Sequence, residues 1–273
     1  MDRDNVADKE FYHFIELFSS QKGIQAVDSP VKLKILAILH TKEMAFDDIV
    51  AHTGKAKSTV SVHLRDLSEA GLIRSRLDPQ DARKKLFLLD STFLGGAHSG
   101  GRDQFDIDQY IPGYIPGDGN IVDFYRLVMS TIRMSLISEG ISIEPVLRNA
   151  GERVGRAIYH TIADHDYEVL IANLQDFWEK YSLGHLEPAG TDPITLMIYD
   201  CFECVDLPVL GRPACAFDSG VIGAVFSNYF GERHIAVETG CYAMGDSFCR
   251  FEVRTLEKEP CDQFEKILRH YLR

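Results

Sequence analysis

Residues 57–73 read KSTVSVHLRDLSEAGLI and decide the fold of the first half of the chain. Apolar side chains recur at Val60, Leu64 and Leu67, at spacings of four and three, which predicts one buried helix face. The opposite face carries small, polar and basic side chains, namely Ser58, Ser61, Val62 and Arg65. Such a face can enter a DNA major groove and meet base edges. We expect this helix over about 56–70, ending at Gly71.

Two further helices precede this one, and two strands follow it. Ser29 and Pro30 supply a cap and a first-turn proline for a helix over 31–40. A short helix fits 45–52, with Gly54 suited to the left-handed position that closes it. Strands are expected over 72–76 and 84–89, joined by a turn at 78–81. Three short helices followed by a basic hairpin describe a winged helix-turn-helix.

The two segments KSTVSVHLRDLSEAGLI and RSRLDPQDARKKLFLL closely resemble the recognition helix and wing of the ArsR and MarR families of prokaryotic regulators. The resemblance covers roughly 29–90 and implies binding to double-stranded DNA. Lys55 and Ala56 replace the usual polar helix cap, at a cost of about 1 kcal/mol. We interpret His63 as a half-buried structural residue. The expected DNA contacts are Lys55, Lys57, Ser58, Thr59, Ser61, Val62, Arg65, Arg76, Arg83, Lys84 and Lys85.

Charge is distributed unevenly along the chain, whose net charge is −12. Residues 29–90 hold 11 Lys and Arg against 8 Asp and Glu, whereas the remaining residues hold 18 against 33. A small basic module on an acidic body can bind DNA through that module alone. No apolar run is long enough to span a membrane, and the charged N-terminal segment is unlike a signal peptide. With six cysteines and no export signal, we expect a cytoplasmic protein in a reducing compartment.

Two segments flank the expected winged helix-turn-helix. Residues 11–18, FYHFIELF, place apolar side chains on one helical face, which predicts a helix that packs on the next domain or mediates dimerisation. Residues 95–120 are rich in Gly, Asp and Pro and indicate a linker or an ordered loop. The expected domains are therefore an N-terminal helix at 1–28, the DNA-binding domain at 29–92, a linker at 93–120 and a second domain at 121–273.

The second domain passes from helices to strands along the chain. Helical periodicity is found at 121–137, 143–162 and 167–183, and Gly151 and Gly155 hint at close helix packing. A strand is expected at 193–201, a helix at 215–230, strands at 232–239 and 248–254, and a last helix at 262–272. This order predicts an α+β fold, in which helices cover an antiparallel sheet.

Residues 238–253, ETGCYAMGDSFCRFEV, bring Cys241 and Cys249 together at two strand ends. With Cys215 upstream and Glu238 nearby, these thiols are soft-metal ligands, redox thiols or buried unligated thiols. The spacing resembles that of the 4-vinyl reductase domain, which serves as the sensing module of several bacterial regulators. The resemblance covers about 121–273, and it implies a structural zinc ion held by Cys215, Glu238, Cys241 and Cys249.

Cys201, Cys204 and Cys261 remain as redox candidates. Residues three apart on a continuous strand point to opposite faces, so Cys201 and Cys204 act together only if the strand ends between them. The combination of an ArsR-like and a 4-vinyl reductase domain resembles the redox-responsive regulators of methanogenic archaea, although Pro208 stands where those proteins have a histidine. A thiol switch, an apolar ligand in a pocket of the second domain, and no sensing at these cysteines remain open.

The sequence thus predicts a transcription regulator without enzymatic activity, a homodimer that binds an inverted-repeat operator and responds to redox state or a small molecule. One rival is a reductase-type enzyme, but no Gly-rich nucleotide loop follows a strand and no catalytic triad pattern is visible. Another is a docking adaptor, which would not need the basic residues Arg65, Arg83, Lys84 and Lys85 around a groove-sized helix.

Overall fold

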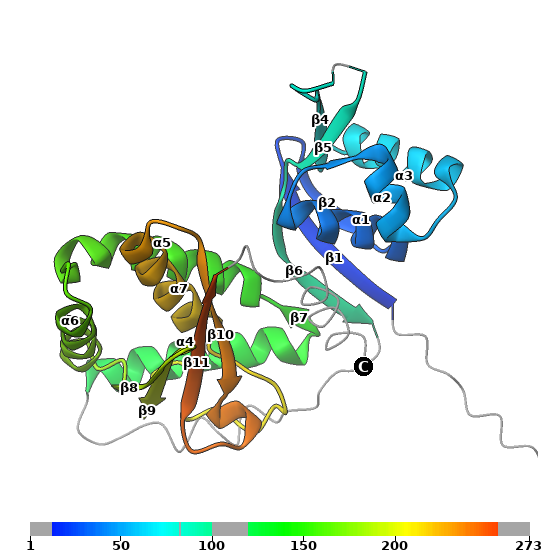
Figure 1. Cartoon of the computed structure of the whole chain (residues 1–273). Coiled ribbons are helices and arrows are strands. Elements are labelled where there is room, and N and C mark those ends of the chain that lie inside the picture. Colours follow the sequence, from blue (N-terminus) through cyan, green and yellow to red (C-terminus); the bar gives the residue numbers. More distant parts are fainter. Residues whose placement is uncertain (1–12, 82, 100–119, 256–273) are drawn as a thin grey trace, which may run out of the picture. The chain divides into compact units, whose positions relative to one another are not determined.

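The computed structural model describes residues 13–81, 83–99 and 120–255 of the chain (Figure 1). The described residues form two compact units. The first comprises the residues up to 99 together with 139–142, and the second comprises 120–138 and 143–255. No helix among these described residues has the length and apolar character needed to cross a membrane. Each unit is described by itself below.

Three helices of the first unit lie where the sequence predicts them. They are α1 (Pro30–Thr41), α2 (Phe46–Thr53) and α3 (Lys57–Glu69). The Ser29 hydroxyl accepts a hydrogen bond from the Lys32 backbone N–H at 3.5 Å and caps α1. Gly54 and Gly71 take φ values of 66° and 73°, which glycine adopts at little cost, so the chain reverses after α2 and α3. Their apolar faces meet in one core, which includes Ile35, Ile38, Ile49, Val60, Leu64 and Leu67.

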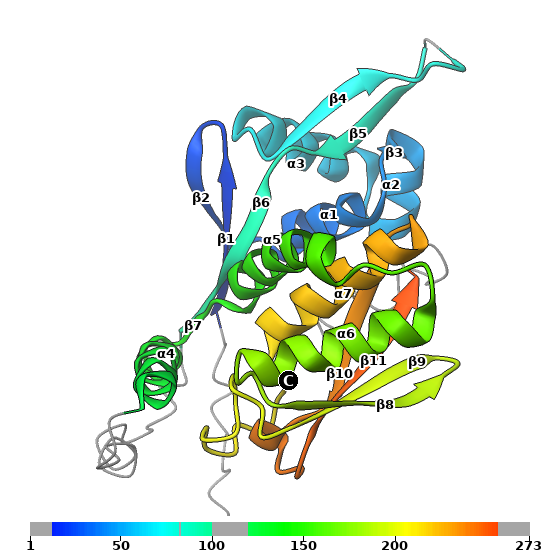
Figure 2. The same ribbon diagram turned by 90° about the vertical axis from the view of Figure 1, so that its left-hand side faces the viewer.

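A three-stranded sheet completes the winged helix-turn-helix. Its strands are β3 (Met44–Ala45), β4 (Ile73–Leu77) and β5 (Lys85–Leu89), in the order β3-β5-β4. Ile73 pairs with Leu89 and Leu77 pairs with Lys85 in an antiparallel register. Figure 2 shows that the β4–β5 hairpin extends beyond the helices of this unit, as a wing does.

The helix predicted for 11–18 is wrong, because this segment forms strand β1 (His13–Ser20). It pairs with β2 (Gly23–Val27) through a turn in which Gly23 has φ 96°, and with β6 (Thr92–Ser99). Phe18 is buried with its ring centroid 5.2 Å from that of Phe93. The apolar spacing of this segment fits a helix and a strand equally well, and the strand prevails because β6, more than 70 residues away, supplies a partner.

The predicted linker at 93–120 also begins as a strand. Gly95 and Gly96 of β6 pair with Leu17 and Glu16 of β1. On its other side β6 pairs with β7 (Ile141–Ser142), giving a sheet with the order β2-β1-β6-β7. Glycine-rich composition favours a loop, but two flanking strands stabilise the extended backbone here. Residues 100–119 lie outside the described part.

The second unit has the α+β fold that the sequence predicts. Its helices are α4 (Ile121–Ser138), α5 (Glu144–Ile162), α6 (Tyr167–Lys180) and α7 (Ala216–Phe230). Its antiparallel sheet has the order β10-β11-β9-β8, formed by β8 (His185–Thr191), β9 (Ile194–Tyr199), β10 (His234–Gly240) and β11 (Cys249–Thr255). Strand β8 was not predicted, because Pro188 and a bulge before Gly190 interrupt its pattern. The helix predicted for 262–272 lies outside the described residues.

Helices α5 and α7 pack almost backbone to backbone. A Cβ atom at Gly151 would lie 2.0 Å from the Phe217 carbonyl oxygen, and one at Gly155 would lie 2.4 Å from that of Val221. A Cβ atom at Gly220 of α7 would be equally close, 2.2 Å, to a carbonyl oxygen of α5. Glycine is required at these positions because any side chain would push the helices apart. This contact fixes α7, whose first turn follows one of the site's cysteines.

Candidate nucleic-acid interface and thiol cluster

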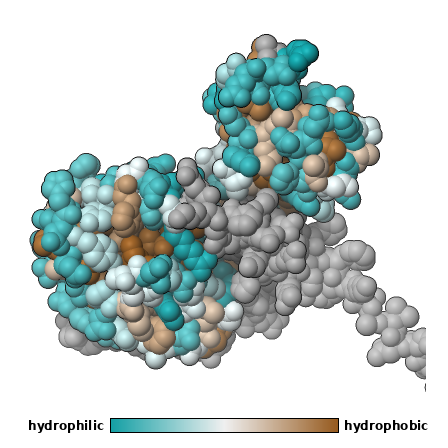
Figure 3. Space-filling model, in the orientation of Figure 1, coloured by the Kyte–Doolittle hydropathy of each residue, from teal (hydrophilic) through white to brown (hydrophobic). Residues whose placement is uncertain are grey.

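The exposed face of α3 and the wing carry the predicted DNA contacts. Val62, an apolar residue, is 45% exposed, although burial would be expected of it in the absence of a partner. The visible surface of the wing in Figure 3 is mostly hydrophilic. All the predicted contact residues are exposed, namely Lys55, Lys57, Ser58, Thr59, Ser61, Val62, Arg65, Arg76, Arg83, Lys84 and Lys85. An exposed valine can contact a thymine methyl group, while the small polar residues beside it reach base edges.

Part of this positive charge is paired with acidic side chains. Lys57 Nζ lies 2.7 Å from Asp47 Oδ1, and both side chains are at least 70% exposed. Three further exposed pairs are Arg65–Glu69, Arg76–Glu43 and Arg83–Asp81. Within the described residues, Lys55, Lys84 and Lys85 have no ion pair. Exposed pairs contribute only about 0–1 kcal/mol each, so phosphate groups can displace these carboxylates at low cost.

His63 lies between the two faces of α3. It is half-buried, and its Nδ1 atom is buried without a hydrogen-bond partner. This location agrees with the structural role that the sequence suggests for it.

Five cysteines converge in the core of the second unit, and all are buried. They come from several separate elements, so the cluster is a product of the tertiary fold. Cys215 precedes the first turn of α7, Cys241 lies between β10 and the short 3-10 helix Tyr242–Met244, and Cys249 begins β11. Cys201 and Cys204 lie in the turns that follow β9.

Three of the predicted metal ligands have the spacing of a zinc site. The Sγ atom of Cys215 lies 3.9 Å from that of Cys241 and 3.6 Å from that of Cys249, and the Cys241–Cys249 separation is 4.0 Å. Thiolates bound to one tetrahedral zinc at about 2.3 Å are held about 3.8 Å apart. The three sulfur atoms therefore form a triangle of the size that one face of such a site requires.

Glu238, the fourth predicted ligand, adjoins these sulfurs. Its Oε2 atom accepts a hydrogen bond from the Cys215 backbone N–H at 2.9 Å, while its Oε1 atom is buried without a partner. One of its carboxylate oxygens lies within 4.8 Å of the three sulfur atoms. Burial raises the pKa of Glu238 well above its ordinary value, because the charged form loses its hydration. A buried oxygen that lacks a partner beside three thiols fits a bound cation.

The structure brings Cys201 and Cys204 into the same cluster, although the sequence suggests a separate pair. Strand β9 ends at Tyr199, and the Cys204 backbone N–H donates to the Cys201 carbonyl oxygen at 3.3 Å in a turn. The Cys204 sulfur lies 3.2 Å from that of Cys249, and the Cys201 sulfur lies 3.6 Å from that of Cys215. Five thiols and one carboxylate thus surround a site of four-coordinate size. Cys261 lies outside the described residues.

Sequence reasoning missed Glu203, which lies between these two cysteines. Its carboxylate accepts the backbone N–H groups of Phe217 and Asp218 at 3.2 and 3.1 Å, and so caps α7. It also forms an ion pair with Arg133 of α4, with both side chains about 10% exposed. Burial raises the pKa of Glu203, and Arg133 opposes that shift. An acidic residue flanked by cysteines was the available signal, but the partner on α4 is 70 residues away.

Comparisons with known proteins agree with this two-part organisation. A model described as bacterial regulatory protein, arsR family, matches residues 29–75, and a model of the 4-vinyl reductase domain matches residues 194–255. Two uncharacterized proteins of Methanocaldococcus jannaschii are similar. One is 37% identical over 86 residues, which cover 32% of this chain and 53% of that protein; the other is 27% identical over 157 residues, covering 56% and 88%. The chain therefore spans about half the length of the first of these curated relatives.

Two solved structures are also similar at low sequence identity. A vinyl-4-reductase family protein from Methanocaldococcus jannaschii is 16% identical, with a TM-score of 0.34 over 57% of this chain and 99% of that one. The phenol-responsive sensory domain of the transcription activator PoxR, solved with phenol, is 13% identical, with a TM-score of 0.41 over 77% and 97%.

The family models and the geometry together define the class of protein. It is a DNA-binding regulator of transcription, with an arsR-type helix-turn-helix near its N-terminus. The chain joins this module to a 4-vinyl reductase domain, whose buried cysteine cluster can hold a metal ion.

Proposed function

We propose that this protein is a transcription regulator, rather than an enzyme, whose 4-vinyl reductase domain holds a structural zinc ion and changes DNA affinity when thiols in that domain are oxidised. The DNA-binding part rests on the exposed α3 face, where Val62 and small polar residues are flanked by lysines without ion pairs among the described residues. We further propose a homodimer that binds an inverted repeat, because helix-turn-helix dimers place two recognition helices one helical turn of DNA apart. Light scattering of the free protein and of its DNA complex tests this stoichiometry.

Binding to DNA from the protein's own upstream region tests the DNA-binding part. Replacing Lys84 and Lys85 by alanine removes two potential phosphate contacts on the wing. We expect the slope of log K against log salt to fall by about one for each phosphate that is no longer neutralised. Lys180→Ala, an exposed change in the second unit, is the matched control and should leave the slope unchanged. Equal slopes for all three proteins would remove the wing from the interface.

The proposed zinc ligands are Cys215, Glu238, Cys241 and Cys249. When bound, zinc acts as a cross-link between the start of α7 and the β10–β11 connection. The chain contributes to this site by holding Glu238 Oε2 against the Cys215 N–H, and by a hydrogen bond at 2.9 Å from the Cys241 N–H to Asp246 Oδ2. These bonds orient the ligands while the buried surroundings exclude water.

Metal analysis of protein purified without chelator tests the zinc site. We expect about one zinc per chain, lost in Cys241→Ser. Cys204 competes with Glu238 as fourth ligand, because its sulfur lies 3.7 Å from that of Cys241. Glu238→Gln and Cys204→Ser therefore form a matched pair, and we expect the first to weaken zinc binding more. Reduced protein that is free of metal would contradict the proposal.

We propose Cys204 and Cys201 as the redox-sensitive thiols. Oxidation of Cys204 with a neighbouring thiol forms one S–S bond and transfers two electrons and two protons to an oxidant such as a peroxide. The 3.2 Å separation of Cys204 and Cys249 needs to shorten to about 2.05 Å for this bond. Such a movement displaces the turn that carries Glu203, and with it the contacts of Glu203 to α7 and to Arg133 of α4.

The route from this turn to the DNA-binding unit follows the chain. Helix α4 ends at Ser138, and the chain then enters β7, which pairs with β6 in the sheet of the first unit. Measuring DNA affinity with and without reductant tests the switch. We expect Cys204→Ser to abolish the difference between the two conditions, and Cys201→Ser to reduce it. An unchanged difference in both variants would remove this pair from the mechanism.

A further inference from the structure

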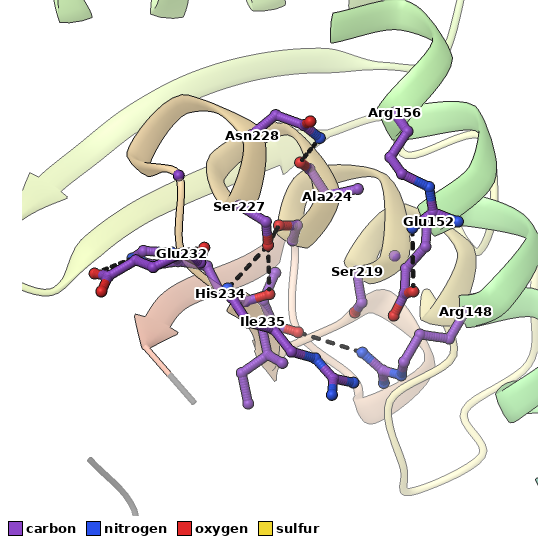
Figure 4. A pocket seen from close by; sticks show the side chains of 15 residues that line it. Arg148, Glu152, Arg156, Ser219, Ala224, Ser227, Asn228, Glu232, His234 and Ile235 are labelled. Carbon is purple, nitrogen blue, oxygen red and sulfur yellow. Dashed lines mark hydrogen bonds and ion pairs between the residues drawn. The ribbon is translucent and has the colours of Figure 1, made fainter. Parts of the chain in front are cut away.

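A cavity of about 480 Å³ lies beside the packed helices α5 and α7, and none of the five described cysteines lines it. One wall is a face of α5 that carries Arg148, Glu152 and Arg156 at spacings of four (Figure 4). The floor is α7, where glycine and alanine residues leave space because they have little or no side chain. The third side is formed by the turn after α7 and the start of β10. This volume lies within the range typical of small-ligand sites.

Positive charge dominates the lining of this cavity, in a chain whose net charge is −12. Arg148, Arg156 and Arg233 contribute three guanidinium groups. Glu152 pairs with Arg156 at 3.6 Å, with both side chains partly exposed, so this pair costs little to separate. Figure 4 shows Glu232, the other acidic residue, across the cavity from Arg148 and Arg156. Among the described residues, no carboxylate pairs with Arg148 or Arg233.

A buried hydroxyl group supplies a second, independent observation. Ser219 is 2% exposed and lines the cavity, and its Oγ atom has no hydrogen-bond partner among the described residues. Figure 4 shows its side chain directed toward Arg148. Leaving a buried hydroxyl unpaired costs about 1–3 kcal/mol, so such groups normally have a partner. The hydroxyl can donate to an acceptor that enters the cavity.

We propose that the second unit binds a small oxyanionic ligand in this cavity, through the phosphate or carboxylate group that such a ligand carries. Arg148, Arg156 and Arg233 provide the charge, since the guanidinium fork matches the geometry of both groups. Arg148 donates one long hydrogen bond, 3.4 Å, to the Ala236 carbonyl oxygen, and its other N–H groups remain for the ligand. Ser219 Oγ donates a hydrogen bond to the same anion. The site is independent of DNA binding and of the thiol switch.

Isothermal titration calorimetry of the full chain in chloride buffer tests the site, with inorganic phosphate and succinate as separate probes. Saturable binding of phosphate, of succinate or of both supports the proposal and identifies the chemical group. Absence of saturable binding for both probes would overturn it. Because phosphate also stabilises proteins by exclusion from their surfaces, a rise in melting temperature alone is not counted as binding.

Three variants locate the binding. The double change Arg148→Gln and Arg156→Gln should weaken binding at least tenfold, on the order expected for two charge-assisted contacts. Ser219→Ala should weaken it about fivefold without a decrease in stability, because this hydroxyl has no partner in the folded chain. Arg153→Gln, an exposed change on α5 outside the cavity, is the control and should have no effect. If the double variant bound phosphate normally and had weaker affinity for DNA instead, the proposal would be wrong and the arginines would be DNA contacts.

Discussion

Charged side chains are used in opposite ways in the two units. Arg133 and Glu203 form a pair inside the second unit, with side chains 11% and 10% exposed, whereas Lys57 and Asp47 of the first unit form a pair that is 70% and 76% exposed. The buried pair joins α4 to the turn of the thiol cluster, and its carboxylate caps α7 as well. The exposed pair holds a cation on the DNA-binding face. Burial therefore makes one pair structural, while exposure leaves the other available for exchange with a ligand.

The same difference separates the sites. The thiol cluster depends on complete exclusion of water and on distances of 3.2–4.0 Å between sulfurs. The DNA-binding face depends on side chains that stay hydrated until phosphate groups displace their water and counterions. A signal read in the interior has to reach the surface through rigid contacts, and the Arg133–Glu203 pair is such a contact.

The largest effect is expected when the buried pair is broken. Arg133→Met leaves the Glu203 carboxylate in the interior without its cation, which typically costs about 3–5 kcal/mol. Trp178 is the only tryptophan of the chain and is fully buried in this unit, so its fluorescence during a urea titration follows the unit's unfolding. We expect a lower urea midpoint in Arg133→Met.

A matched second variant separates the charge from the packing. In the double variant Arg133→Met and Glu203→Gln the unpaired carboxylate is gone, so much of the lost free energy of unfolding should return. Equal midpoints for the single and double variants would mean that Arg133 stabilises the unit through the contacts of its side chain, independently of the charge on Glu203.

The fold could be predicted from the sequence wherever the signal was local. The Ser29 cap, the positive-φ glycines and the spacing of Val60, Leu64 and Leu67 determine α1 to α3 within a few residues of their expected positions. Strands β1 and β6 were not predicted, because pairing between residues more than 70 positions apart decides them. An apolar spacing that fits both a helix and a strand cannot reveal such a partner.

The candidate site follows the same division. Cys215, Glu238, Cys241 and Cys249 could be grouped through their spacing and the family resemblance, and the structure places them within ligand distance of one another. That Cys201 and Cys204 join them depends on the end of β9 and on the turn that follows. The role of Glu203 as a contact between α4 and α7 is equally a property of the folded chain.

An intermediate effect is expected at Glu16, a carboxyl group in the sheet of the first unit. Burial raises its pKa from 4.5 to about 7. Its folded pKa lies above its unfolded pKa, so the folded state binds more protons between these values and loses stability as pH rises through this window. Glu16→Gln removes this loss. We expect the variant to match the parent at pH 4.5 and to exceed it at pH 8 by at most about 3 kcal/mol.

Differential scanning calorimetry at the two pH values measures this difference, in the transition that Trp178 fluorescence does not follow. Asp48→Asn, an exposed carboxylate on α2, is the control and should change stability by the same small amount at both pH values. A Glu16→Gln effect that is independent of pH would show that Glu16 is ionised in the folded state with an ordinary pKa.

The smallest effect on stability is expected for the exposed pair. Asp47→Asn removes the partner of Lys57, and an exposed pair of this kind contributes about 0–1 kcal/mol. The free energy of unfolding should therefore hardly change. DNA affinity should rise instead, because Lys57 no longer has to leave a carboxylate and one negative charge is absent from the interface. Fluorescence anisotropy at several salt concentrations measures this rise, which should shrink as salt screens the charges. If Asp47→Asn lowered stability as strongly as Arg133→Met and left DNA affinity unchanged, the contrast between an interior structural pair and an exchangeable surface pair would not hold.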